Sequence, residues 1–479
     1  MLATDTETHT ECSADRRLRE LIEKVKLQSG WGAAPQAASV QSSRKRCIDG
    51  PFTPEAPRSL EETGLEDHQL EALVLKFLLN RGVASGAAIA TQVRLPFAMT
   101  AEFLRGLKES QLVAHRRSSG VLGDFEFQLT DKGIAQSKRY LAQSTYYGAA
   151  PVPFHDYVAA VAAQSVNKET ITPRRLHAAL ADLSLSDQML SRLGQAMTAG
   201  RALFLYGLPG NGKTSIAERL TAAFGSEIWI PRAILCDADI VRVYDPMLHV
   251  EVPASGLTQS DDLDRRWIRI RRPTIVVGGE LTMNNLEITV NETVGILEAP
   301  LQLKSNCGTL VIDDFGRQRM TTDQLLNRWI VPLEKQFDYL NFPSGKKVQV
   351  PFDQIIVFST NLDPERLVDE AFLRRIPYKI EAKDPSETEF RTLLKAMASK
   401  FDIAFCEATV EYLLAKHYRP VNRPLRYCHT RDLMLQIKHL CDYHSQPREM
   451  TLNHIDIAVA NYFSATATRS DNGSIGQQS

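Results

Sequence analysis

The phrase GLPGNGKTS, which begins at Gly207, constrains the fold of this 479-residue chain more than any other feature. It matches the pattern G-x-x-x-x-G-K-[ST] in full, with an apolar run ending at Tyr206 before it and a helical run from Ser215 after it. Glycines let backbone N–H groups curl around phosphates, and the N-terminus of the following helix adds partial positive charge. We therefore expect a strand–loop–helix unit that binds the phosphates of a nucleotide.

The side chains of this loop have separate predicted roles. Lys213 is expected to reach the β- and γ-phosphates of ATP, and the Thr214 hydroxyl is expected to ligate Mg²⁺. The predicted nucleotide-binding set is Gly207, Leu208, Pro209, Gly210, Asn211, Gly212, Lys213, Thr214 and Ser215. The alternative is another glycine-rich turn before a helix, which the acidic strand later in the chain disfavours.

Two later apolar runs end in polar side chains. Residues 309–314 read TLVIDD, so a strand would place Asp313 beside the phosphate-binding loop, where it can hold Mg²⁺. Residues 354–361 read QIIVFSTN, and Asn361 at the end of that run can orient an attacking water. Apolar strands that alternate with helices indicate a parallel sheet. In this order after the loop, the runs predict a site for nucleotide hydrolysis.

The phrases GLPGNGKTS, LVIDDFGR, VFSTN and DEAFLRRIPYKI together resemble the Walker A, Walker B, sensor 1 and arginine-finger regions of AAA+ ATPases. The resemblance covers about 150–465, and its helical end resembles the lid domain, with Arg431 matching the sensor 2 arginine. The alternative for Arg431 is a surface ion pair with Asp432 or Glu411. Residues 298–314 are similar to a phrase of the MoxR-type, magnesium-chelatase-like and enhancer-binding members.

That resemblance implies an oligomeric ring, usually a hexamer, which turns ATP hydrolysis into movement of a partner. Arg374 and Arg375 match the arginine finger that reaches the γ-phosphate held by a neighbouring subunit. Such a finger accelerates hydrolysis by about 10³- to 10⁵-fold, so a monomer is expected to hydrolyse ATP poorly. The alternative is a helix-end charge cluster with Asp369 and Glu370.

Asp314 stands where the family usually carries glutamate. The second acid of the pair polarises the attacking water, and aspartate is one methylene shorter than glutamate. A displacement of about 1 Å can lower the rate by about 100-fold. We therefore expect slow hydrolysis with Asp314 as general base or water positioner, and Mg²⁺ binding through Asp313 unaffected.

The chain divides into six predicted segments. Between two tails expected to be disordered, four segments are expected to fold, and together they predict an α/β P-loop NTPase of the AAA+ type with a helical lid. The segments are a tail (1–62), a winged-helix-like α+β domain (66–145), a helical linker (146–200), a nucleotide-binding α/β domain (201–383) with a strand-rich insertion near 232–300, a helical lid (384–465) and a second tail (466–479).

The winged-helix-like segment reads as three helices, a hairpin and a further helix, which is a common DNA-binding arrangement. It contains ten Lys and Arg residues against eight Asp and Glu residues, and its basic cluster is His115, Arg116 and Arg117. Contacts with phosphates supply most non-specific DNA affinity. A nearly balanced charge is therefore as consistent with a protein client as with DNA.

Composition limits the remaining possibilities. The chain has 56 basic and 57 acidic side chains, so any binding to nucleic acid must be local. Its seven cysteines include no C-x-x-C pair, which fits a reducing compartment better than a disulfide framework. The apolar runs are too short to span a membrane, and the start MLATDTETHTEC does not resemble a secretory signal. We expect a cytoplasmic protein with no membrane partner.

Three functions remain open from the sequence. The first is a chaperone-like, oligomeric Mg²⁺-ATPase that remodels a protein or protein–DNA client. The second is an ATP-gated binding module that does not hydrolyse ATP. The third is a DNA-associated regulator that uses the winged-helix-like domain to find its sites. The insertion near 232–300 is either a client-engaging loop or an exposed hairpin.

Overall fold

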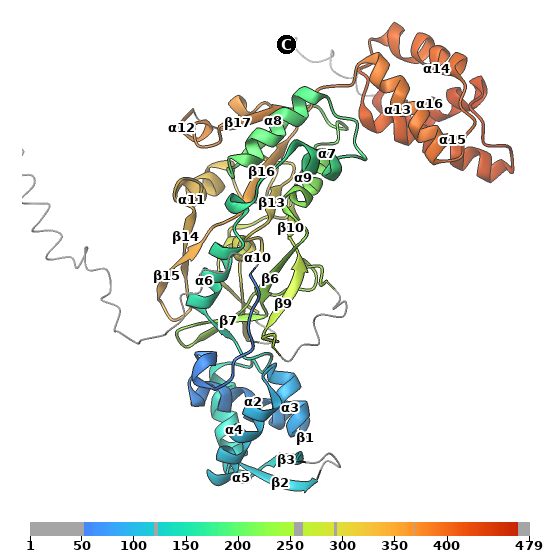
Figure 1. The fold of residues 1–479 in the computed structure, drawn as a ribbon. Helices are drawn as coiled ribbons and strands as arrows, with labels where there is room; N and C mark the ends of the chain where they lie inside the picture. Colours follow the sequence, from blue (N-terminus) through green and yellow to red (C-terminus); the bar gives the residue numbers. More distant parts are fainter. Residues whose placement is uncertain (1–51, 119–122, 253–261, 292–294, 369, 468–479) are drawn as a thin grey trace, which may run out of the picture. The chain divides into compact units, whose positions relative to one another are not determined.

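The computed structural model describes residues 52–118, 123–252, 262–291, 295–368 and 370–467 (Figure 1). Most of the two predicted tails lies outside these residues, and so does Asp369. The stretch 52–62, expected to be part of the first tail, is instead packed: the ring of Phe52 lies 5.4 Å from that of Trp267, and Ala56 N–H donates to Asp262 O. Apolar side chains in this stretch find partners far along the chain, which its polar composition did not reveal.

The first folded unit combines four helices with a small antiparallel sheet of order β1-β3-β2. Its helices and hairpin lie where the sequence predicted them, and the short β1 was not predicted. The winged-helix interpretation of this unit stays a prediction. The elements are η1 (Glu61–Thr63), α2 (Asp67–Arg81), β1 (Val83–Ser85), α3 (Gly86–Val93), α4 (Phe97–Glu109), β2 (Val113–Ser118), β3 (Phe125–Leu129) and α5 (Asp131–Gln143).

Five parallel strands form the central sheet, in the order β10-β13-β16-β5-β17. Most of their residues are buried, as expected for a parallel sheet with both faces covered. The strands are β5 (Leu203–Tyr206), β10 (Thr274–Val277), β13 (Thr309–Ile312), β16 (Ile355–Thr360) and β17 (Tyr378–Glu381). The glycine-rich loop leaves β5, so the chain has the α/β P-loop NTPase fold that the sequence predicted.

Helices and short turns connect these strands. Around the phosphate-binding loop, β5 leads into α9, and β13 is followed by α11 and the hairpin of β14 and β15. The connecting elements are α9 (Lys213–Leu220), η3 (Thr221–Phe224), α10 (Leu301–Lys304), α11 (Thr322–Lys335), β14 (Phe337–Asn341), β15 (Lys347–Pro351), η5 (Pro364–Arg366) and α12 (Glu370–Leu373).

The strand-rich insertion differs from its prediction in two respects. Thr274–Val277 (β10), expected inside the insertion, pairs with β13 instead, because Ile275 and Val277 are buried in the core of the parallel sheet. Within the stretch predicted to be strand-rich, Met283–Leu286 instead forms a turn (η4). The insertion therefore lies on both sides of β10 and contains β6 (Glu227–Pro231), β7 (Ala233–Cys236), β8 (Asp239–Arg242), β9 (Trp267–Arg271), β11 (Thr289–Asn291) and β12 (Ile296–Glu298).

These strands form two further sheets. One has the order β11-β12-β8-β7-β4 and takes its last strand, β4 (Val152–Pro153), from the segment before the nucleotide-binding domain. The other is the antiparallel pair of β6 and β9. Ala233 of β7 is fully buried in the same apolar core as the first unit, and Leu235 and Ile240 pack against that core. The insertion and the first unit therefore share side-chain packing.

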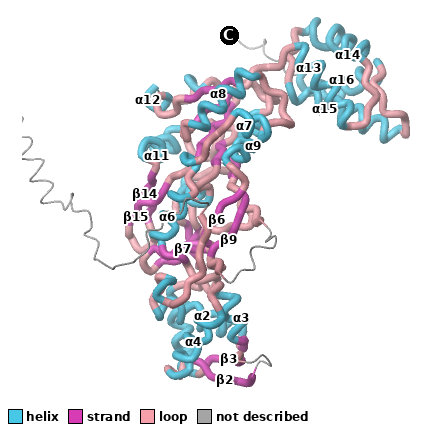
Figure 2. The backbone as a smooth tube through the Cα atoms, viewed as in Figure 1, coloured by secondary structure: helices cyan, strands magenta, loops and turns pink. Residues whose placement is uncertain are grey.

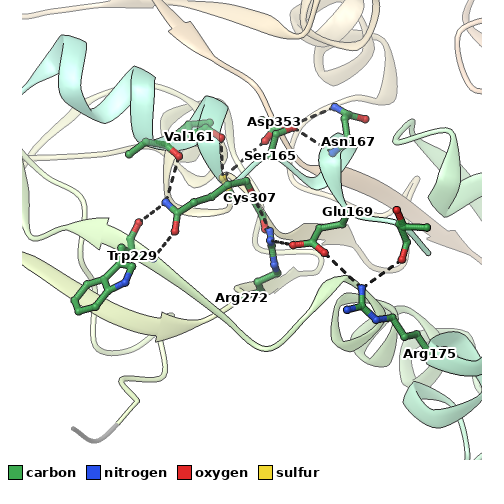
Figure 3. A network of polar contacts seen from close by, with 12 residues as sticks. Val161, Ser165, Asn167, Glu169, Arg175, Trp229, Arg272, Cys307 and Asp353 are labelled. Carbon is green, nitrogen blue, oxygen red and sulfur yellow. Dashed lines mark hydrogen bonds and ion pairs between the residues drawn. The ribbon is translucent and has the colours of Figure 1, made fainter. Parts of the chain in front are cut away.

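The predicted linker is helical and is held to the central sheet by a network of polar contacts (Figure 3). Ser165 Oγ and Asn167 Nδ2 donate to Asp353 Oδ1 at 2.9 and 3.2 Å. Arg272, 8% exposed, donates to Cys307 O at 2.7 Å and forms an ion pair with Glu169. The linker helices are α6 (Phe154–Ala163), η2 (Val166–Lys168), α7 (Pro173–Ala179) and α8 (Asp187–Thr198).

This network lies at the starts of three core strands. Arg272, Cys307 and Asp353 each come two residues before a strand, namely β10, β13 and β16. Burial raises the pKa of Asp353, and hydrogen bonds from Ser165 act against that shift. The phosphate-binding loop follows the carboxyl end of β5. The network therefore holds the opposite edge of the sheet, where the parallel strands begin.

Beyond β17 the described chain contains only helices and loops (Figure 2). Apolar residues from all the long helices of this region, including Phe390, Val410, Leu433 and Ile455, form one buried core, as the predicted lid requires. The elements are α13 (Glu387–Lys400), α14 (Glu407–Leu413), a π-helical turn η6 (Leu414–Tyr418), η7 (Arg419–Val421), α15 (Tyr427–His444) and α16 (Leu452–Ala467). Across the described residues, no helix is long and apolar enough to cross a bilayer.

Candidate functional site

The phosphate-binding loop follows β5 and has the backbone that its glycines permit. Gly207, Gly210 and Gly212 have φ values of 140°, 88° and 74°, in a region that residues with a Cβ rarely adopt. A Cβ on Gly207 would lie 2.5 Å from Ala382 O, so the loop also requires close approach to the end of β17. Gly212 is the N-cap of α9, and this helix begins at Lys213, two residues before the helical run predicted from Ser215.

Lys213 is held inside the loop. Its side chain is 7% exposed overall, and Nζ donates to Gly207 O at 2.9 Å and to Leu208 O at 3.0 Å. Burial lowers the pKa of Lys213, and the carboxylates of Asp313 and Asp314 act against that shift. The ammonium group is therefore fixed at the loop and faces both acids.

Asn361 connects Lys213 to Asp314. Lys213 Nζ donates to Asn361 Oδ1 at 2.6 Å, and Asn361 Nδ2 donates to Asp314 Oδ1 at 3.1 Å. The three residues come from α9, the turn after β13 and the end of β16, which are neighbours because β13, β16 and β5 are adjacent in the sheet. The structure thus brings together three of the predicted site residues through one side-chain amide.

Asp313 lies beside Thr214, with Thr214 Oγ1 donating to Asp313 Oδ2 at 2.8 Å. A hydroxyl and a carboxylate are oxygen ligands of the kind that Mg²⁺ prefers, and Mg²⁺ commonly takes few protein ligands together with water and phosphate oxygens. Within the described residues no group of three or more His, Cys, Asp and Glu side chains is placed to hold a metal. The Thr214–Asp313 pair fits a Mg²⁺ ion that arrives with a nucleotide.

The backbone at Asp314 is left-handed, with φ at 47°. Aspartate and asparagine adopt this region several-fold more often than most residues, which suits aspartate better than glutamate at this turn. Gln318 Nε2 donates to Asp313 O and Asp314 O at 2.9 and 3.1 Å, and Phe315 N–H donates to Ser359 O. These bonds fix the acidic turn against β16. Gln318 was not predicted, because only its contact in the folded turn reveals its role.

Asn211 ties the phosphate-binding loop to the segment after β17. This buried residue donates from Nδ2 to Ala382 O at 3.1 Å and to Asp384 Oδ1 at 2.6 Å. Asp384 lies just before the lid, at the boundary predicted from the sequence. The Asn211 amide therefore connects the loop to the segment that leads into α13.

Arg426, in the predicted lid, contacts the loop, whereas the role predicted for Arg431 toward nucleotide stays a prediction. Arg426 Nη1 donates to Pro209 O at 2.5 Å, and the neighbouring Cys428 N–H donates to Gly210 O at 3.0 Å. The side chain of Arg431 is 61% exposed and forms an ion pair with Asp432 at 2.8 Å, which is the alternative considered for it. Arg426 was missed because it precedes the HTRDL phrase, although its place as N-cap of α15 marks a helix start.

Arg374 and Arg375 come directly after α12. Arg374 is exposed, and its N–H donates to Glu370 O at 3.2 Å. Arg375 forms an ion pair with Glu334 of α11 at 3.3 Å. A role of either arginine toward a neighbouring subunit stays a prediction.

Comparison with known proteins gives matches of two kinds. The family model described as Domain of unknown function (DUF8689) matches residues 386–461, in the lid. No curated protein matches the chain. Solved structures that resemble it include a RuvB mutant of Thermotoga maritima, at 13% identity and a TM-score of 0.37, over 59% of this chain and 72% of that one.

Two further solved structures are similar at the same level. The Thermotoga maritima RuvB Holliday junction branch migration motor is 13% identical with a TM-score of 0.35, over 59% of this chain and 71% of that one. NtrX from Brucella abortus in complex with ATP is 13% identical with a TM-score of 0.34, over 59% and 57%. The assignment of the fold therefore rests on the sheet order and the loop, not on these similarities.

Proposed function

We propose that the protein binds Mg²⁺-ATP at residues 207–215 and hydrolyses it slowly, as an oligomer, to remodel a macromolecular client. The observation that carries this proposal is the pair of hydrogen bonds from Lys213 to Asn361 and from Asn361 to Asp314, next to the Thr214–Asp313 contact. A purely structural glycine-rich turn would not require a buried lysine facing two carboxylates. The closeness of these side chains favours a site that binds and hydrolyses a nucleoside triphosphate.

The loop and Lys213 bind the triphosphate in this proposal. Backbone N–H groups of the loop and the N-terminus of α9 face the phosphates, and Lys213 exchanges carbonyl partners for phosphate oxygens. Thr214 and Asp313 would hold Mg²⁺, which neutralises charge on the phosphates when bound. Binding of the triphosphate therefore replaces the bonds that Lys213 makes to Gly207 O, Leu208 O and Asn361 Oδ1.

Asp314 and Asn361 position the attacking water. The Asp314 carboxylate accepts its proton, and the Asn361 amide, released from Lys213, orients the water toward the γ-phosphate. The shorter acid reduces the reach of the carboxylate, while the left-handed backbone at Asp314 sets its direction. We expect a slow enzyme rather than an inactive one.

Arg374 and Arg375 are the proposed arginine finger of an oligomeric ring, which we propose to be a hexamer. The ion pair of Arg375 with Glu334 supports Arg374, which is exposed, as the residue that reaches a neighbour. An arginine finger is worth about 10³ to 10⁵ in rate, so assembly would control turnover. Arg426 replaces Arg431 as the proposed lid arginine that responds to nucleotide, because it already bonds to Pro209.

We propose that the client binds the winged-helix-like unit. The client is either a protein or a protein–DNA complex. On the sheet face of this unit, Arg117 pairs with Glu126 at 2.7 Å, so part of its basic cluster is already neutralised. That pairing favours a protein client. A second candidate function is an ATP-gated binding module without turnover, and the observation favouring it is the aspartate at position 314.

An ATP-trapping experiment tests this proposal. Asp314→Asn removes the base but keeps the side-chain size, so the variant is expected to bind ATP as tightly as the wild type and to lose about 100-fold or more in turnover. Asp323→Asn, an exposed carboxylate on α11, is the matched control and should change neither quantity. Turnover unchanged in Asp314→Asn would contradict the assigned base.

Mixing variants distinguishes hydrolysis that needs a neighbouring subunit from hydrolysis by a single chain. Arg374→Ala together with Arg375→Ala removes the finger, and Asp314→Asn removes the base. Each variant alone is expected to be nearly inactive, whereas a mixture would recover part of the activity because a finger from one subunit meets a base from another. No recovery in a mixture that assembles would contradict a finger acting between subunits.

A further inference from the structure

A cavity of about 700 Å³ lies outside the phosphate-binding loop. Its lining comes from α2, α3 and α5 of the first unit, the segment 145–149, and the strands β8 and β12 with their neighbours. It includes none of residues 207–215. This volume is within the usual range for small-molecule sites. The walls are part of a packed structure, because Ala233, next to the lining residue Arg232, is buried in the core of the first unit.

The charges on this lining are all positive. Lys76, Arg232 and Arg242 contribute to it, and the lining contains no aspartate or glutamate. Leu79, Leu141 and Ile296 supply apolar wall. A hollow that combines several cations with apolar surface attracts an organic anion rather than a neutral lipid or a metal ion.

Lys76 lacks a negative partner although it is almost completely buried. It is 4% exposed, and burial lowers the pKa of its amine to about 8. Within the described residues its ammonium group donates one hydrogen bond, to Ser144 O at 3.0 Å, and forms no ion pair. An ammonium group has three N–H donors, and buried lysines are rare unless they are paired. An anion in the cavity would supply the missing acceptor.

The two arginines are also incompletely paired. The guanidinium of Arg232 lies 5.4 Å from the ring centre of Tyr244, and its buried Nε has no hydrogen-bond partner among the described residues. Burial lowers the pKa of Arg232, the charge of Arg94 acts in the same direction, and the charge of Glu251 acts against them. Arg242 pairs with Glu298 through Nη2, which leaves its own buried Nε without an acceptor there. Unpaired guanidinium N–H groups bind phosphate and carboxylate well.

We propose that this cavity binds a small organic phosphate or carboxylate, whose anionic group is held by Lys76 and Arg232 and whose apolar part lies against Leu79, Leu141 and Ile296. The site stands apart from ATP hydrolysis and does not depend on it. The ligand contacts both the first unit and the insertion, so its binding stabilises their packing.

Calorimetry on the full chain with three probes tests the site. Lys213→Ala is introduced first, so that the phosphate-binding loop does not bind the probes. Phenyl phosphate is expected to bind at one site per chain with a dissociation constant below about 1 mM. Inorganic phosphate is expected to bind about tenfold more weakly, because it lacks the apolar part. Benzoate distinguishes the two anion chemistries: binding tighter than that of phenyl phosphate would identify a carboxylate ligand.

Variants assign that binding to the cavity. Arg232→Gln and Lys76→Met are each expected to weaken the best probe by about tenfold or more, since each removes a charge-assisted hydrogen bond. Lys138→Met and Arg139→Gln, on the exposed surface of α5, are the matched controls and should leave binding unchanged. Lys76→Met should fold at least as stably as the parent, because it removes a buried cation without a negative partner.

One variant keeps the test independent of the buried residues. Asn80 is exposed and lines the cavity, so Asn80→Asp adds a repelling charge without disturbing the core. It is expected to weaken anion binding several-fold. The proposal is overturned if none of the three probes binds saturably at 10 mM, or if Arg232→Gln and Asn80→Asp bind them as the parent does.

Discussion

Lys213 Nζ donates to Asn361 Oδ1 at 2.6 Å, so the residue after the loop glycines and the residue that follows β16 are in direct contact. The same amide donates to Asp314 Oδ1 at 3.1 Å. A single side chain therefore holds both the cation that would meet the phosphates and the acid that would meet the water. A ligand that binds Lys213 should therefore also change the hydrogen bonding between Asn361 and Asp314.

Replacing Asn361 tests this coupling. Asn361→Leu removes both bonds, and we expect turnover to fall by about 100-fold while the affinity for ATP changes little. Steady-state phosphate release and equilibrium ATP binding, measured on the same preparation, separate the two effects. The exposed Asn284→Leu is the control. If Asn361→Leu weakens ATP binding as strongly as turnover, the side chain serves binding and not the water.

The two lid arginines give opposite expectations. Arg426→Ala removes the bond to Pro209 O, and we expect nucleotide affinity to fall by about tenfold. Arg431→Ala should have little effect, because Arg431 is exposed and pairs only with its neighbour Asp432 in the described structure. Fluorescent-nucleotide titration of both variants measures this difference. A larger loss in Arg431→Ala would restore the role that the sequence motif assigned to it.

His429 makes the lid sensitive to acid. Burial lowers its pKa to about 4, and Arg426 and Arg423 act in the same direction, while Tyr418 Oη lies 3.0 Å from its Nδ1. An unfolded histidine titrates near about 6.5, so between that pH and about 4 only the unfolded chain binds the proton. The free energy of unfolding should therefore fall as the pH falls through this range.

Urea unfolding between pH 7 and pH 4 measures this contribution. His429→Gln cannot take up the proton, so its stability should depend less steeply on pH than that of the wild type. The exposed His439→Gln should keep the wild-type slope. Equal slopes in all three proteins would mean that His429 does not stay neutral in the folded lid.

The network at the far edge of the sheet should affect stability and not chemistry. Arg272→Met leaves Glu169 and the carbonyls of Cys307 and Gln164 without their partner, and we expect a loss of about 2 kcal/mol in the free energy of unfolding. Arg271→Met, the exposed neighbour, should cost far less. Denaturant unfolding checks both. Turnover per folded molecule should stay unchanged, and a large fall in it would connect this edge to the site.

The sequence predicted the parts of the site that lie in short continuous phrases. The loop at 207–215, the acidic run that ends at Asp314 and the run that ends at Asn361 each combine an apolar strand with a polar end, and that pattern is local. Their closeness followed from the rule that the ends of adjacent parallel strands meet at one edge. These predictions depended on no contact between distant residues other than strand pairing.

The features that the sequence did not reveal depend on contacts between distant residues. Whether Thr274–Val277 joins the central sheet or the insertion depends on its pairing with β13, which its own apolar character cannot decide. Arg426 contacts Pro209 across 217 positions of the chain. The cavity takes Lys76 from α2 and Arg242 from β8, so no single stretch of sequence marks it.

Phosphate release measured against protein concentration tests the central claim most directly. Wild type is expected to release phosphate from Mg²⁺-ATP at a rate per chain that rises with concentration, because the site is completed by a neighbouring subunit. Lys213→Ala is expected to stay at background at every concentration. Wild-type release that never exceeds that of Lys213→Ala would contradict ATP hydrolysis at this site.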